Sequence, residues 1–104
     1  ALARVVDDGA IENVYRLQIM NRTETPQTYE VAVSGVTGLT WSAPSVTVPA
    51  TGIESVVVRL RLPESAARPL QGRSAPVIFE VTTGRGVREP PVRLREKSAF
   101  FVPR

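Results

Sequence analysis

Carboxylates are the residues of this sequence that could carry chemistry, because cysteine and histidine are both absent. Their absence excludes disulfides, haem–histidine ligation, zinc and iron–sulfur ligation, and any catalytic dyad or triad built on these two residue types. Asp7, Asp8 and Glu12 offer the hard oxygen ligands that suit Ca²⁺, but they lack the alternating acidic pattern of a calcium loop. We therefore expect a solvated turn here, no metal site, no catalytic residue and no small-molecule substrate.

Positive charge is the second candidate feature. Thirteen Lys and Arg residues against ten Asp and Glu residues give a net charge of +3. Cations at alternate positions of a strand share one face. Such cations are Arg59 and Arg61 in one predicted strand, and Arg93, Arg95 and Lys97 in another. Together with Arg16 they are predicted to form a basic stripe on one sheet, which would dock an acidic protein or anionic lipid headgroups.

The alternative for these cations is a solvated strand face that discourages edge pairing. Nucleic acid is not expected as a partner, because the six aromatic residues fall mostly at inward positions and leave no stacking platform. Trp41, the only tryptophan, is either a core residue or a binding anchor, and it joins the five cations in the candidate docking surface. Asn21 opens an Asn-Arg-Thr glycosylation sequon, which is a short match.

Short β-strands must position these residues. Valine occurs 16 times against seven leucines, and nine prolines with seven glycines leave little room for long helices. Apolar and polar residues alternate with period two in most of the runs between turn signals. Strands are expected near Val5 and over residues 11–20, 27–34, 39–41, 45–48, 53–62, 77–81 and 92–101. This spacing is typical of an all-β fold, an Ig-like antiparallel β-sandwich of about seven strands, with one domain over residues 1–104.

Several local features are also predicted. The runs 11–20 and 27–34 are expected to pair antiparallel, because only a short polar segment joins them. The parity change after Ile53 indicates a bulge near Glu54. One helical turn near residues 66–68, a hairpin turn over 83–86 and a frayed N-terminus over 1–4 are expected. Asn13 is an inward polar residue whose amide should bond local backbone, and with Tyr15 it is assigned to folding.

The run DGAIENVYRL, residues 8–17, resembles the opening motif of the C-terminal domain of the FixG/CcoG family. These are membrane-bound, ferredoxin-like accessory proteins of cbb-type cytochrome oxidase. The similarity continues at Asn21 and over residues 26–29, 33–39, 48–50 and 98–103, so it covers nearly the whole chain.

The resemblance implies an Ig-like domain on the periplasmic side of the bacterial inner membrane, attached through membrane segments of a larger protein. It places two [4Fe–4S] clusters elsewhere in that protein and none in this chain. It further implies a role in copper reduction and delivery during oxidase assembly. The implied partners are oxidase-assembly or copper-handling proteins, or the membrane segment of the same protein.

Two other functions compete with this hypothesis. A carbohydrate- or surface-binding Ig-like module of a secreted protein would share parts of the motif, but would expose aromatic rings for stacking on sugars. A domain that binds copper directly is disfavoured, since Met20 is the only sulfur ligand in the sequence.

Overall fold

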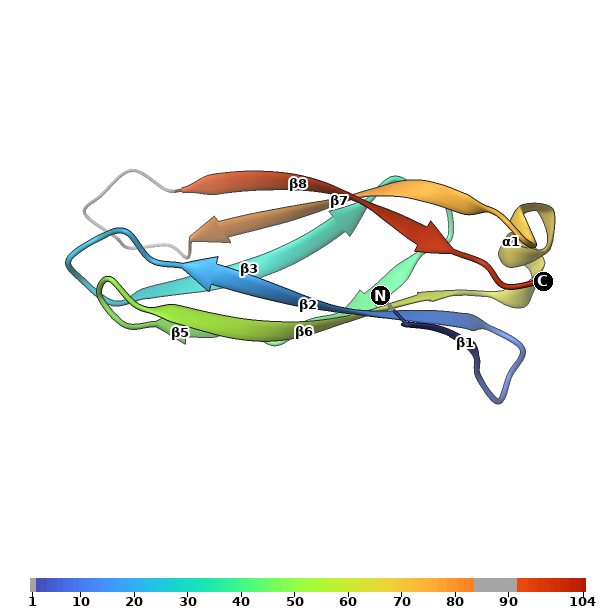
Figure 1. Ribbon diagram of the computed structural model, residues 1–104, viewed down its shortest axis with the longest axis horizontal. Coiled ribbons are helices and arrows are strands. Elements are labelled where there is room, and N and C mark those ends of the chain that lie inside the picture. Colours follow the sequence, from blue (N-terminus) through green and yellow to red (C-terminus); the bar gives the residue numbers. More distant parts are fainter. Residues whose placement is uncertain (1, 84–91) are drawn as a thin grey trace.

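The computed structural model describes residues 2–83 and 92–104, which form two four-stranded antiparallel sheets. One sheet has the strand order β1-β2-β6-β4 and the other β5-β3-β7-β8. We call them the β2–β6 sheet and the β3–β7 sheet. Figure 1 shows them as two stacked layers, with α1 at one end. The elements are β1 (Leu2–Val5), β2 (Ile11–Met20), β3 (Gln27–Ser34), β4 (Thr40–Ser42), β5 (Val46–Val48), β6 (Ile53–Leu62), α1 (Glu64–Ala67), β7 (Ser74–Thr83) and β8 (Arg93–Phe101).

Alternation along β6 explains how the core is built. Val56, Val58, Leu60 and Leu62 are all buried, while the residues between them face outward. Facing them from the other sheet are buried residues of β7 and β8, including Phe79 and Phe100. Because each sheet buries one face against the other, the arrangement is the predicted all-β sandwich.

The expected bulge near Glu54 is not formed. The pairing of β2 with β6 runs without interruption from Ile11 opposite Leu62 to Met20 opposite Ile53. Ile53 therefore keeps its parity and lies on the outer face, where it is 54% exposed beside Met20. Met20 is its direct neighbour across the strands, a position at which apolar side chains stabilise a sheet.

The predicted pairing of 11–20 with 27–34 is also wrong. β2 pairs with β1 and β6, whereas β3 pairs with β5 and β7, so the chain crosses between the sheets after Met20. The crossing puts the apolar faces of β2 and β3 in opposite layers of the core, which buries both. Asn21 secures it: its Nδ2 lies within 3.1 Å of the carbonyl oxygens of Thr25, Val48 and Pro49.

Residues 2–4, part of the segment expected to fray, lie in a strand, while residue 1 lies outside the described residues. Leu2–Val5 form β1, which pairs with Ile11–Val14 of β2, and the expected turn follows at Asp7, where Gly9 has φ +80°. The side chain of Arg4 binds Glu12 across this pair, which anchors the segment expected to fray. Among the described residues β1 covers only the first half of β2, so Tyr15–Met20 have a strand neighbour on the β6 side alone.

The connection from β6 to β7 contains the predicted helical turn, which begins earlier than expected, as α1, and continues into a 3₁₀ turn over Arg68–Leu70. The predicted hairpin turn over residues 83–86 lies largely outside the described residues. Within the described part of the chain, no helix has the length and apolar character needed to cross a membrane.

Candidate docking surfaces

The predicted basic stripe is divided between two sheets. Arg59 and Arg61 belong to β6, while the cations of β8 belong to the other sheet. Both sets face away from the core, as the alternation predicts. The sandwich therefore carries two separate basic clusters on opposite outer faces. Their positions in the sequence could not reveal this, because strand order is decided by long-range pairing.

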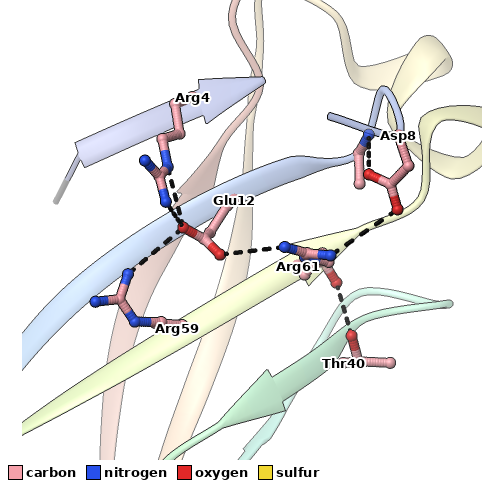
Figure 2. A network of polar contacts seen from close by, with 7 residues as sticks. Arg4, Asp8, Glu12, Thr40, Arg59 and Arg61 are labelled. Carbon is pink, nitrogen blue, oxygen red and sulfur yellow. Dashed lines mark hydrogen bonds and ion pairs between the residues drawn. The ribbon is translucent and has the colours of Figure 1, made fainter. Parts of the chain in front are cut away.

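In the first cluster, arginine side chains surround the carboxylate of Glu12 (Figure 2). Glu12 accepts hydrogen bonds from Nε and Nη2 of Arg4 at 3.1 and 2.8 Å. Arg59 and Arg61 lie 3.5 and 3.6 Å from its two carboxylate oxygens, and Arg61 also lies 3.9 Å from Asp8. The hydrogen bond from Arg4 lowers the pKa of Glu12, and the charges of the three arginines lower it further against the opposing effect of burial.

The burial of Glu12 on an outer sheet face is thus caused by the arginines that cover it. Its side chain is 7% exposed, whereas those of Arg4, Arg59 and Arg61 are 48–64% exposed. The arginine at each side comes from a different strand, since Arg4 and Arg61 stand directly opposite Glu12 in β1 and β6. A carboxylate with this many cation contacts fixes the strands in register and leaves less unbalanced charge for a partner.

The acidic side chains of the turn at Asp7 and Asp8 are not gathered as a ligand set. Among residues 2–83 and 92–104, no three His, Cys, Asp or Glu side chains gather as ligands. Asp8 instead accepts a hydrogen bond from the backbone N–H of Ala10 at 3.2 Å, which stabilises the turn.

The second cluster is less balanced. Nε of Arg93 and of Arg95 lie 3.8 and 3.9 Å from the two carboxylate oxygens of Glu80 on β7. Lys97 makes no ion pair with the described part of the chain. Two of the three cations along β8 therefore contact one partly exposed carboxylate at long range, so this cluster is less neutralised than the one around Glu12 and Asp8.

Trp41 bridges the two sheets on the β4 side. It stands opposite the buried Leu60 in β6 and is 43% exposed. Its indole Nε1 donates a hydrogen bond of 3.3 Å to the carbonyl oxygen of Val31 in β3, beyond the part of β3 that β5 covers. Trp41 is therefore an exposed residue outside the core, and its use as a binding anchor stays a prediction.

Asn13 and Tyr15 close the opposite side, where β2 lies near β8. The backbone N–H of Phe101 donates to Oδ1 of Asn13 at 2.8 Å, and Nδ2 of Asn13 donates to the carbonyl oxygen of Phe101 at 2.9 Å. The hydroxyl of Tyr15 donates to the carbonyl oxygen of Ala99 at 2.6 Å. The expectation that Asn13 bonds local backbone is thus wrong, since its partner lies 88 positions along the chain.

Packing on Phe79 also holds Tyr15 in this junction. Its ring packs edge-to-face on Phe79 with centroids 5.0 Å apart, and burial raises the pKa of its hydroxyl to about 12. An inward polar residue in an otherwise apolar strand face was the sequence signal for this junction, but the signal did not name the partner.

Beyond this junction, the described residues leave the same side of the sandwich open. A cleft of about 480 Å³ separates the second half of β2 from the first half of β8. Leu17 and Met20 line it on one side and Leu94 and Glu96 on the other, and Arg22, Tyr29 and Val81 also belong to its lining, which is thus largely but not wholly apolar. Met20 and Leu94 are 51% and 54% exposed. The candidate docking surface is therefore this cleft with the adjacent cations of β8, a combination that the sequence reading did not anticipate.

The sequon at Asn21 serves the fold. Asn21 is 1% exposed. Its Oδ1 accepts hydrogen bonds from the backbone N–H and the hydroxyl of Thr23, at 2.9 and 2.7 Å. Every amide atom of the side chain is thus engaged, so the folded chain does not present it for glycosylation.

Comparisons with known proteins were made by family, by sequence and by structure. The family model described as "IG-like fold at C-terminal of FixG, putative oxidoreductase" matches residues 1–103. No curated protein gives a significant match. A crystal structure of a FixG-related protein from Vibrio parahaemolyticus superposes with a TM-score of 0.68 at 19% identity, covering 91% of this chain and 81% of that one. A crystal structure of a protein from Archaeoglobus fulgidus has a TM-score of 0.56 at 20% identity, covering 97% and 92%. These structural matches support the fold.

Proposed function

The chain belongs to the family of Ig-like domains found at the C-terminus of FixG, and from this membership we propose that it is a non-catalytic docking module of a FixG-like membrane protein. The proposed module is periplasm-facing. The redox chemistry would reside in two [4Fe–4S] clusters elsewhere in the protein. The module would help that protein in copper reduction or delivery during assembly of a cbb-type cytochrome oxidase.

The family match over residues 1–103 is the observation that carries this proposal. The residue inventory agrees with it, because a chain without Cys or His supplies no ligand for a cluster or for tight copper binding. The surface agrees as well, since a largely apolar cleft beside unbalanced positive charge suits recognition of another protein. The partners we propose are oxidase-assembly or copper-handling proteins, or the membrane segment of the same protein.

The test is a deletion of residues 1–104 from the full-length protein, with membranes assayed separately for copper reduction and for assembled oxidase. A control protein carries an unrelated Ig-like domain of similar size in place of this one, which preserves spacing and bulk. We expect copper reduction to persist in both proteins and assembled oxidase to fall in both.

Three outcomes would overturn the proposal. Normal oxidase assembly in the deletion strain would remove the docking role. Full activity of the domain swap would show that any spacer suffices. Loss of copper reduction, with the protein present at its normal level, would mean that the domain supports the redox machinery itself.

A further inference from the structure

The two halves of the β8 edge differ in whether their outward backbone N–H and C=O groups have hydrogen-bond partners. In an antiparallel strand the N–H and C=O groups of successive residues point alternately to the two sides. The carbonyl oxygen of Val92 accepts from Thr83 of β7, and the carbonyl oxygen and N–H of Val102 bond Gly72 and Arg73. The even positions of β8 therefore face β7, and the odd positions face away from it.

At two of the odd positions, Ala99 and Phe101, the outward backbone groups meet Tyr15 and Asn13, as described above. At the other three, Arg93, Arg95 and Lys97, no hydrogen bond from the described residues reaches the outward backbone groups. With respect to residues 2–83 and 92–104, this half of β8 is an unpaired strand edge whose donors and acceptors are available.

A second unpaired edge faces the same cleft. The carbonyl oxygen of Ala10 accepts from Val6 on the β1 side, and the N–H of Asn21 bonds Gly52 on the β6 side. By the same alternation, the backbone groups of Arg16 and Gln18 point toward the side where β1 has ended. Leu17, Met20 and Leu94 line the space between the edges, so an added strand would find apolar surface for every second side chain.

The side chains of β8 select what that strand can be. Arg93, Arg95 and Lys97 lie on the outer face; the first two contact the carboxylate of Glu80, and Lys97 has no ion pair among the described residues. A strand paired with β8 would place its own outward side chains directly beside these cations, where opposite charges are favourable and like charges are not. A second copy of β8 would bring cations against cations, so the charge pattern disfavours self-pairing and favours an acidic strand.

We propose that the β8 edge over Arg93–Lys97 binds an extended segment of a partner protein in which acidic residues alternate with apolar ones. The segment becomes a fifth strand of the β3–β7 sheet. Its acidic side chains contact the cations on the outer face, and its apolar side chains enter the cleft beside Leu94 and Leu17. This inference rests on the proposed docking function and deepens it by naming the surface and the chemistry of the partner segment.

The test is an NMR titration of the isolated chain with a synthetic seven-residue peptide of alternating Glu and Val, capped at both ends. We expect amide shifts concentrated over residues 93–97 and along the cleft, with slowed hydrogen exchange at the amides of Arg93, Arg95 and Lys97. A peptide of the same length with Lys in place of Glu should bind at least tenfold more weakly, because it repeats the charge of β8.

Two arms test strand pairing as opposed to simple charge attraction. One peptide carries N-methyl groups on its Glu amides and another carries them on its Val amides. Only alternate amides of an added strand face β8, so one methylated peptide should lose binding and the other should keep it. Equal behaviour of the two methylated peptides would overturn the strand mode.

A matched pair of variants tests the location. Lys97→Glu should weaken binding of the Glu–Val peptide about tenfold, since it reverses one of three charges along the edge. Arg73→Glu makes the same change at an exposed cation outside β8 and should leave binding within twofold. Equal effects of the two variants, or shifts that map away from β8, would overturn the proposal.

Self-association of the isolated chain through residues 93–97 would also contradict it, because the occupant would then be a second copy. Failure here is distinguishable from failure of the docking function. If the peptide does not bind but the deletion strain still loses assembled oxidase, another face of the domain docks the partner. If the deletion strain assembles oxidase normally, the proposed docking function itself is wrong.

Discussion

The side of the sandwich on which β2 approaches β8 has a closed half and an open half. In the closed half, Asn13 and Tyr15 bind the backbone of Phe101 and Ala99, and Phe100 is fully buried. In the open half, the same two strands diverge around a cleft and Leu94 is 54% exposed. One strand thus serves two purposes along its length: its second half seals the core and its first half remains available.

The difference teaches where polar side chains are needed in a small sandwich. A buried strand edge must have its N–H and C=O groups bonded, and the amide of asparagine supplies both a donor and an acceptor. An edge that faces water needs no such partner, because water satisfies it. Stability should therefore be concentrated in the closed half.

The largest expected effect compares two inward residues of β8. Phe100→Ala should lower the free energy of unfolding by about 3–5 kcal/mol, because it empties a fully buried site. Leu94→Ala should cost about 0.5 kcal/mol, since its side chain is largely solvated. Urea denaturation of both variants checks the pair. A similar loss for both would mean that the cleft is closed in solution.

The next effect concerns the polar residues of β2. Asn13→Leu keeps the approximate size of the side chain but leaves the N–H and C=O of Phe101 without their partner, which should cost about 3 kcal/mol. Gln18→Leu on the same strand lies in the open half and should change stability by about 0.5 kcal/mol or less. Urea denaturation midpoints of the two variants measure this difference. Equal losses of stability would contradict the distinction between the closed and open halves.

A smaller effect should appear at high pH. Burial raises the pKa of Tyr15 to about 12 from an ordinary value of 10.0. Between these values the unfolded chain releases the phenolic proton while the folded chain retains it. The stability contributed by neutral Tyr15 is therefore complete below pH 10 and is lost as the pH rises through about 12. The full shift corresponds to roughly 2–3 kcal/mol.

Comparison with Tyr15→Phe isolates this effect from other titrations. The stability difference between the wild-type chain and Tyr15→Phe should shrink as the pH rises from 10 to 12. Burial also raises the pKa of Tyr29, but Tyr29 is the same in both proteins, so its titration cancels from this difference. A constant difference across this pH range would contradict the buried environment assigned to Tyr15.

The sequence was sufficient to locate the strands but not to predict which strands pair with each other. Period-two alternation located β2, β3 and β6 to the residue, because alternation is a local property of a half-buried strand. Pairing is not local, so the same pattern wrongly joined β2 to β3 and placed two basic clusters on one sheet. Glu12 illustrates the limit: its parity indicated exposure, but arginines from β1 and β6 cover it.

For the same reason, the sequence predicted only part of the candidate docking surface. The cations of β8 could be found from their spacing, and the resemblance in residues 8–17 identified the family that the later comparison confirmed. The cleft beside those cations depends on where β1 ends and where β8 diverges from β2, which no residue type encodes by itself. Charge was thus predictable and shape was not.

The hydrogen bonds between Asn13 and Phe101 also bear on how the chain acquires its fold. Their partners are separated by 88 positions, so the junction cannot form until nearly all of the described strands have been synthesised. Folds that depend on such distant contacts nucleate slowly, on the scale of milliseconds to seconds. Until β8 arrives, a nascent chain would expose the buried faces of β3 and β7 and be open to aggregation or chaperone binding. We therefore expect closure of this sandwich to wait until β8 has emerged from the ribosome.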